Sequence, residues 1–292
     1  MSWRLFRWTW RLESPLFVGT LPAGSLNRCR LYVPARVIWG ALTAELARHK
    51  ASGFPDYESE GRTLRENARF TYLYPAEPDG ERWRAWLPRY ESRGLVWRRE
   101  DRQDGNGDRF DREMRMRLLD ARPATAIDPD SDSAEEGSLR ETECVLPSWR
   151  GTGLPVAYVG YVFVRGDLPE LQIPNALFLG GDTRYGLGRV RRVEQCTPAS
   201  DLFGAPVNLN AEAPIVQSHQ LLLLAHAHAG SRQIVGSLEL LAGWDRTRRD
   251  SFCQLSETPL WTPGSRVRDD DRRGADWEIC EDGIWRVPSN SG

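Results

Sequence analysis

Lysine is almost missing from this chain of 292 residues. Lys50 is the one lysine, so every other basic residue is an arginine, and the formal net charge is −2. A balance this close to zero excludes the strongly basic composition that marks many nucleic-acid-binding proteins. The charges are nevertheless separated along the chain, with seven arginines in residues 98–117 and seven acids in residues 128–143. Such separation can hide a basic surface inside a near-neutral total.

Cysteine pairs and long apolar runs are missing as well. No C-x-x-C pair occurs, which argues against a zinc site and a disulfide framework. The scattered cysteines are Cys29, Cys144, Cys196, Cys253 and Cys280. No apolar run approaches the length of a membrane span, and residues 1–7 alternate apolar and charged side chains, unlike a signal peptide. We therefore expect a soluble cytoplasmic protein with no membrane partner, no metal and no cofactor.

The most informative stretch is the glycine-rich segment 179–190. Its glycines and the arginines in and after it are Gly180, Gly181, Arg184, Gly186, Gly188, Arg189, Arg191 and Arg192. Glycine permits positive φ and close backbone approach, and arginine offers a planar fork suited to phosphate. The segment lacks a Walker lysine and the glycine spacing of a dinucleotide fingerprint. It is either a loop that lies along a polyanion backbone or a turn that only closes a tight hairpin.

Periodicity along the chain predicts an α+β fold with antiparallel strands and few helices. Residues 3–12 alternate and predict a strand, and residues 36–50, behind Pro34, repeat apolar side chains at helical spacing. Residues 155–164 are apolar on both faces, which is typical of a central strand. Further strands are expected at 69–74, 94–98, 114–119, 138–146, 189–193, 215–229 and 234–242, and a short helix at 169–178.

Histidines are the first candidates for acid–base chemistry. His226 and His228 stand two apart, so on a strand they would share one face, with His219 on the opposite face. Such a pair could serve acid–base catalysis or bind a metal. No third ligand is evident in the sequence, which favours ordinary core or surface histidines.

Carboxylates between residues 128 and 132 are the second candidates. Asp128, Asp130 and Asp132 alternate like the start of a calcium loop, but the glycine and the distal glutamate do not follow in place. A solvated acidic hairpin is the favoured interpretation. Catalysis by Asp128 is the alternative.

Four stretches in this order resemble the RAMP superfamily, the subunits of CRISPR effector complexes, and within it the type III systems. Ser14–Gly19 is similar to the family's opening motif after its first strand, and 32–42 to its helix entry. Residues 125–139 resemble the segment that leads into the family's thumb hairpin. The glycine segment resembles the pattern Gly-Gly, a few residues, then Arg-x-Gly-x-Gly-Arg/Lys-Val.

The resemblance implies a particular organisation. Residues 1–193 would form a ferredoxin-like βαββαβ core, with a thumb-like hairpin inserted at about 98–146. Residues 194–292 would be a strand-rich C-terminal extension packed on the same domain. The thumb residues implied are Ala126, Ile127 and Asp128.

Two departures from the family pattern bear on function. Ala35-Arg36-Val37 replaces the usual Gly-Ser-Ser at the helix entry, so Arg36 is expected to take over a phosphate contact. Family members that cut RNA carry an aspartate in the preceding loop, whereas residues 21–30 contain no acid. The resemblance therefore implies a non-catalytic subunit that binds guide RNA and complementary target RNA and assembles with other effector subunits.

The expected RNA contacts follow from the arginines and glycines of the matching loops. They are Arg28, Arg30, Arg36, Trp39, Gly180, Gly181, Arg184, Gly186, Gly188, Arg189, Arg191 and Arg192. Trp39 stays open between base stacking and core packing, whereas Trp8 and Trp10 are expected in the core. A target-RNA-cutting subunit that uses Asp128 and a globular protein with no RNA role remain the alternatives.

Overall fold

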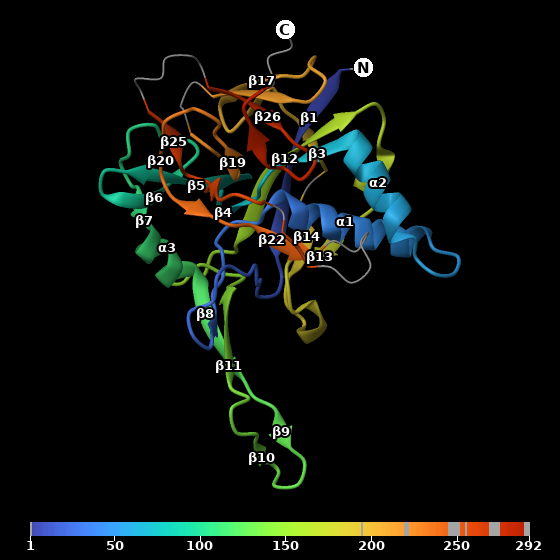
Figure 1. The fold of residues 1–292 in the computed structure, drawn as a ribbon, viewed down its shortest axis with the longest axis vertical. Helices are drawn as coiled ribbons and strands as arrows, with labels where there is room; N and C mark the ends of the chain where they lie inside the picture. Colours follow the sequence, from blue (N-terminus) through green and yellow to red (C-terminus); the bar gives the residue numbers. More distant parts are fainter. Residues whose placement is uncertain are drawn as a thin grey trace.

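The computed structural model describes residues 2–193, 195–218, 222–244, 252–254, 256–268 and 275–288. These residues form an α+β fold with mostly antiparallel sheets and few helices, as predicted (Figure 1). His219, a candidate from the sequence, lies outside the described residues. No helix in the described part of the chain is long and apolar enough to cross a membrane.

The main sheet is built around two long strands. β1 (Trp3–Leu12) pairs antiparallel with β12 (Ala157–Arg165) over nearly its whole length. The sheet continues in the order β13-β14-β1-β12-β4-β5-β6-β7, with β15 on β1 and β3 on β12. The bounds are β3 (Ala68–Phe70), β4 (Tyr74–Asp79), β5 (Arg82–Glu91), β6 (Gly94–Arg99), β7 (Arg109–Phe110), β13 (Ala176–Phe178), β14 (Arg189–Arg192) and β15 (Thr197–Pro198).

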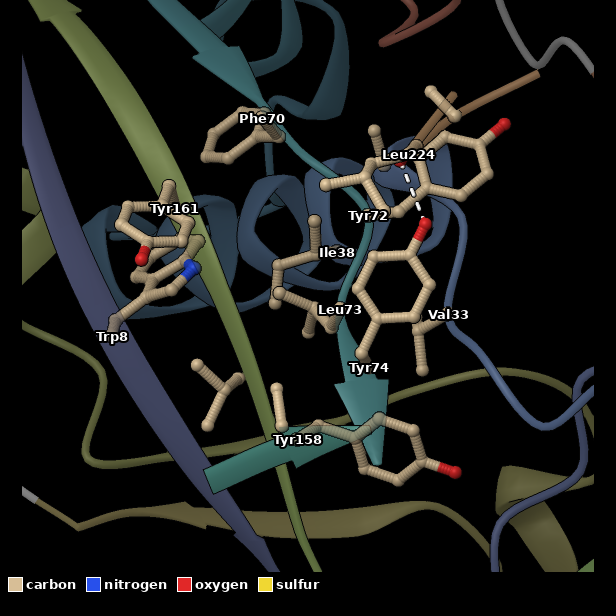
Figure 2. Close-up of a cluster of buried hydrophobic side chains, with 14 of the residues drawn as sticks. Trp8, Val33, Ile38, Phe70, Tyr72, Leu73, Tyr74, Tyr158, Tyr161 and Leu224 are labelled. Carbon is tan, nitrogen blue, oxygen red and sulfur yellow. Dashed lines mark hydrogen bonds between the residues drawn. The ribbon is translucent and has the colours of Figure 1, made fainter. Parts of the chain in front are cut away.

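The predicted central strand is confirmed. Every residue of β12 except Arg165 is buried, as expected of a run that is apolar on both faces and pairs with β1 on one side and with β3 and β4 on the other. Gly160 has a steric role in it, since a Cβ atom there would stand 2.7 Å from the Tyr72 carbonyl oxygen. Trp8 of β1 stacks on Phe70 with ring centroids 5.9 Å apart in this core (Figure 2).

Two helices lie together beside the main sheet (Figure 1). α1 (Ala35–Lys50) begins directly after Pro34, as predicted, and buries Ile38, Leu42 and Leu46 at a spacing of four residues. α2 (Tyr57–Asn67) was not predicted. Its sequence is strongly polar and only Gly61 and Leu64 are buried, so it carries little of the apolar periodicity that reveals a helix.

Two segments adopt a different secondary structure from the one predicted. Residues 114–119 do not form a strand, because α3 (Asp111–Leu118) ends there and the next strand begins at Leu119. The alternation of methionine and arginine is misleading, since Met114 and Leu118 are the buried positions, one helical turn apart. The helix expected at 169–178 is only a 3₁₀ turn, η1 (Pro169–Gln172), followed by β13. Pro174 lies at this break and cannot continue a helix.

A long hairpin projects from the body of the molecule (Figure 1). β8 (Leu119–Ala124) pairs antiparallel with β11 (Arg140–Val145), and β2 (Leu26–Asn27) adds to β11 in parallel. The short strands β9 (Ile127–Asp128) and β10 (Ser133–Ala134) form its tip. We call residues 119–145 the hairpin.

The C-terminal strands form an eight-stranded sheet that packs on the same core. Its order is β16-β17-β18-β26-β27-β19-β24-β21, and β20–β25 and β22–β23 form two separate two-stranded sheets. The bounds are β16 (Asp201–Leu202), β17 (Ala205–Asn208), β18 (Ile215–Ser218), β19 (Ala227–His228), β20 (Ile234–Val235), β21 (Leu238–Glu239), β22 (Ala242–Trp244), β23 (Phe252–Gln254), β24 (Leu260–Trp261), β25 (Arg266–Val267), β26 (Ala275–Ile279) and β27 (Trp285–Arg286).

The strands expected at 215–229 and 234–242 are therefore broken into short pieces. Residues 222–226 are buried without strand pairing along their length, so hydrophobicity there reflects core packing and not an extended strand. One contact ties this segment to the main sheet: the Tyr74 hydroxyl donates to the Leu224 carbonyl oxygen at 2.8 Å (Figure 2).

Candidate nucleic-acid interface

The glycine segment connects β13 to β14 and packs closely on the residues that follow β1. The Gly181 amide donates to the Phe17 carbonyl at 2.9 Å, and the Gly188 amide donates to the Pro15 carbonyl at 2.7 Å. At Gly180, where φ is +79°, a Cβ atom would stand 2.1 Å from the Phe17 carbonyl oxygen. These contacts engage two of the amides that could have faced a phosphate. The glycines thus fix the loop against the segment after β1.

Three arginines of β14 have different roles. Arg189 and Arg191 both bind Glu13, at 3.0 and 2.5 Å, and about half of each side chain is exposed. The hydrogen bond from Arg191 lowers the pKa of Glu13 below its usual value. Arg192 lies against the interior, with its guanidinium carbon 5.0 Å from the Trp10 ring centroid, and burial lowers its pKa. Arg192 therefore supports the fold.

The tip of the glycine segment faces solvent near the hairpin. The turn η2 (Thr183–Tyr185) exposes Arg184 and 71% of Tyr185. The guanidinium carbon of Arg140, on the hairpin, lies 5.2 Å from the Tyr185 ring centroid. The predicted loop residues and the hairpin thus share one side of the molecule at this point.

A groove of about 740 Å³ lies between α1, the glycine segment and the C-terminal strands. Five of the predicted contact residues line it: Arg30, Arg36, Trp39, Gly180 and Gly181. Arg30, Arg36 and Trp39 come from residues 30–39, at the entry and start of α1, and the two glycines come from the glycine segment, which is far away in the sequence. We call this site the α1 groove.

Aromatic and apolar side chains make up much of the α1 groove. Tyr57, Tyr72 and Phe178 line it from α2, from the segment before β4 and from β13. Trp39 donates from Nε1 to the Gly61 carbonyl at 3.1 Å, and one face of its ring carries the Arg65 guanidinium at 4.3 Å. A mostly apolar surface with a few directed polar groups is typical of a site for an organic ligand or an unstacked nucleotide.

A second, charged groove of about 1200 Å³ adjoins the first. Arg36, Trp39 and Asp282 line both, so they form the boundary between the two. The second groove carries arginines and acids in similar number, and several are paired: Arg69 lies 3.6 Å from Glu281. Its charges thus largely compensate one another.

The other predicted contacts lie outside both grooves. Arg28 is exposed on the loop before α1, and the remaining residues follow the glycine segment away from α1. They are Arg184, Gly186, Gly188, Arg189, Arg191 and Arg192. Conversely, no sequence motif marks the groove residues Tyr57, Tyr72, Phe178 and Asp282.

The two histidines are not brought together. His226 is fully buried, whereas His228 is exposed on the short strand β19. The prediction that His226 and His228 share one face of a strand is wrong, because His226 lies before β19 and is not part of it. His226 Nδ1 lies 2.7 Å from the Tyr72 hydroxyl and Nε2 is bound to Glu239. Among the described residues, no group of three or more His, Cys, Asp or Glu side chains could hold a metal ion.

Asp128 has a local role at the hairpin tip. Its carboxylate accepts hydrogen bonds from the Asp130 amide at 2.9 Å and from the Ser131 hydroxyl at 2.7 Å. The bond from the Asp130 amide, followed by that from Ser131, lowers the pKa of Asp128. This arrangement is typical of an Asx turn. Nearby, Ala126 accepts from the Glu135 amide, and 59% of Ile127 is exposed.

Comparisons with known proteins bear on the fold. No family model matches this chain, and no curated protein matches it in sequence. A chain in the cryo-EM structure of the type III-B Cmr-beta complex bound to cognate target RNA and AMPPnP is similar, with a TM-score of 0.55 and 12% identity. The match covers 90% of this chain and 85% of that chain. This chain has the fold of a type III-B Cmr-beta subunit.

A second structure agrees. A chain of Cmr-beta bound to cognate target RNA matches with a TM-score of 0.55, 13% identity and coverage of 90% of this chain and 86% of that chain. The resemblance to type III effector subunits that the four motifs predicted is therefore confirmed at the level of the fold.

Proposed function

We propose that this chain is an RNA-binding and scaffolding subunit of a type III CRISPR ribonucleoprotein in the cytoplasm. In this role it binds guide RNA in the α1 groove and assembles with other effector subunits. The observation that carries the proposal is the convergence of Arg30, Arg36, Trp39, Gly180 and Gly181 on one groove, from two stretches that are far apart in the sequence. The same fold in two Cmr-beta structures with bound target RNA supports it.

The core supports a ferredoxin-like interpretation. The strands β14, β1, β12 and β3/β4 lie side by side in this order, and the connection from β1 to β3 contains α1 and α2. Along the chain, these elements follow one another as in a βαββαβ unit, whose four strands would be β1, β3/β4, β12 and β14. In this proposal η1 stands in place of the second helix, and residues 194–292 are an extension on the same domain.

The groove chemistry suits a backbone that carries phosphates. Arginine pairs with phosphate through a planar fork, and such contacts position a nucleic acid without reading its sequence. Sequence is then left to base pairing between guide and target. Aromatic side chains such as Tyr57 and Phe178 would contact bases or riboses along the same path.

Binding of labelled single-stranded RNA with a repeat-derived constant end tests the proposal. We expect Arg36→Ala to weaken binding about tenfold and to reduce the slope of log K against log salt by about 1, as for one lost phosphate contact. Arg82→Ala is the matched control, because Arg82 is exposed at the start of β5 and lies outside both grooves. Equal affinity of the two variants would contradict the proposal and favour a globular protein with no RNA role.

Target-RNA cutting by Asp128 remains the second hypothesis from the sequence. Magnesium-dependent cleavage of a complementary RNA that Asp128→Ala abolishes would support it. Asp130→Ala is the control, because it removes a neighbouring carboxylate and leaves the Asp130 amide that bonds Asp128.

A further inference from the structure

A buried chain of polar side chains joins the C-terminal strands to the loop before α1. Arg30 Nη1 donates to both oxygens of the Glu239 carboxylate, at 2.6 and 2.9 Å. The same carboxylate is bound to His226 Nε2, and His226 Nδ1 lies 2.7 Å from the Tyr72 hydroxyl. We call Arg30, Glu239, His226 and Tyr72 the buried network.

The donors and acceptors of the buried network follow from its chemistry. An ionised carboxylate only accepts, so His226 carries its proton on Nε2 and accepts from the Tyr72 hydroxyl on Nδ1. Burial lowers the pKa of His226 and keeps the ring neutral. Burial also raises the pKa of Tyr72 well above its usual value, so the hydroxyl stays protonated and is a poor nucleophile. The arrangement therefore holds groups in place and does not activate them.

Each member of the buried network is held on several sides. His226 is completely buried and uses both ring nitrogens, and Tyr72 is 1% exposed. The side chains of Arg30 and Glu239 are only 11% and 15% exposed. A guanidinium fixed in this way has already lost the rotamer freedom that it would otherwise lose when a ligand binds.

The buried network ends in the α1 groove. Arg30 and Tyr72 line that groove, and so do Leu241, Ala242 and Gly243, which follow Glu239 almost directly along the chain. The C-terminal region approaches α1 on this side, since a Cβ atom on Gly283 would stand 2.1 Å from the Ala35 Cβ. The C-terminal region thus supplies one wall of the groove and also the groups that fix Arg30.

We propose that Glu239 and His226 are positioning residues for Arg30, so that the C-terminal region completes the RNA-binding groove. This inference rests on the proposed function. It assigns Arg30 the role of an aligned hydrogen-bond donor toward RNA, with its charge offset by Glu239. It also predicts that loss of the Glu239 carboxylate weakens RNA binding. Loss of an acid near an RNA site ordinarily strengthens binding through simple electrostatics, so the two effects have opposite directions.

Binding of the repeat-derived RNA to the full chain tests the inference. We expect Glu239→Ala to weaken binding about tenfold, whereas Glu45→Ala, which removes an acid of α1 that lines neither groove, should leave binding unchanged. Tyr72→Phe removes only the hydroxyl that bonds His226 and should weaken binding in the same direction by a smaller factor. Glu239→Gln keeps an acceptor for Arg30 and should restore part of the affinity. Circular dichroism verifies that each variant is folded.

A double-mutant cycle decides whether Glu239 acts through Arg30. Arg30→Ala combined with Glu239→Ala should bind RNA no more weakly than Arg30→Ala alone, because the positioned group is already gone. Full additivity, or tighter binding by Glu239→Ala and unchanged binding by Tyr72→Phe, would overturn the inference while Arg36→Ala still weakens binding. Absence of RNA binding by the unaltered chain would instead overturn the proposed function.

Discussion

Gly188 lies so close to Leu179 that a Cβ atom on it would stand 1.9 Å from the Leu179 carbonyl oxygen. The two residues sit at opposite ends of the glycine segment, and the Leu179 amide donates to the Gly188 carbonyl at 2.8 Å. This contact closes the loop. The glycine pattern that suggested a phosphate-binding loop is thus explained in large part by backbone packing.

We therefore expect Gly188→Ala to destabilise the protein through this clash. Gly186 is the matched control, since its φ is also positive, at +82°, but a Cβ atom there meets no atom within 4 Å. Gly186→Ala should cost about 1–2 kcal/mol of conformational strain. Gly188→Ala should cost a further ~1–3 kcal/mol from overpacking. Equal unfolding free energies in urea would contradict this account.

Substitution of Arg192 and of Arg184 should affect the stability of the fold to different extents. Arg192 lies over Trp10 and donates to Gln172 at 3.1 Å, so Arg192→Ala should lower the free energy of unfolding by about 1–2 kcal/mol. Arg184 is exposed, and Arg184→Ala should leave the melting temperature unchanged. Thermal unfolding of both variants measures this, and a larger loss for Arg184→Ala would be inconsistent with the structure.

Lowering the pH should reduce the free energy of unfolding through protonation of Glu239 in the buried network. Burial raises the pKa of Glu239, but the bond from His226 and the charge of Arg30 outweigh it and lower the pKa from 4.5 to about 2. Because the folded pKa is the lower one, the stabilisation is complete above pH 4.5 and is lost as the pH falls toward 2. At ~1.4 kcal/mol per pKa unit the full contribution is about 3 kcal/mol.

His226 changes stability in the same direction. Burial lowers its pKa below 6.5, so its neutral form stabilises the fold above that pH and the contribution decreases on acidification. Urea unfolding between pH 7 and 3 measures the total, and Glu239→Gln should flatten the loss below pH 4.5. Parallel curves for this variant and the unaltered chain would refute the role assigned to Glu239.

The hairpin should be dispensable for folding. Residues 120–140 are exposed or half-buried, and Ala124 pairs directly with Arg140. Replacing residues 125–139 with Asn-Gly, which favours a two-residue turn, should therefore keep the melting temperature within a few degrees. If the hairpin contacts RNA as the family resemblance implies, the shortened protein should also bind RNA more weakly. Loss of the folded state would show that the hairpin supports the body.

The sequence predicted those elements whose buried residues form a regular pattern along the chain. α1 and β12 were identified because Ile38, Leu42 and Leu46 repeat at helical spacing and because residues 157–164 are apolar on both faces. α3 was misread because its helical signal lies in the ion pairs Asp111–Arg115 and Glu113–Arg117 and not in its apolar residues. Short C-terminal strands carry too few residues to show any period.

The groove was only partly predictable for a different reason. Arg36 and the glycines belong to motifs that could be recognised by their order along the chain, and Arg30 lies in the loop just before one of them. Tyr72 and Glu239 acquire their positions only when residues 222–244 pack against the main sheet, so no local pattern marks them. The convergence of separate segments is a property of tertiary structure.

Ultraviolet crosslinking of native RNA to the chain shows whether guide RNA occupies the α1 groove. The chain would be purified with its cellular partners, the co-purified RNA sequenced and the crosslinked residues mapped by mass spectrometry. We expect short RNAs that share a constant repeat-derived end, with crosslinks at Trp39, Tyr57 or Phe178 in the α1 groove. Crosslinks confined to residues outside that groove, or the absence of such RNAs, would contradict this expectation.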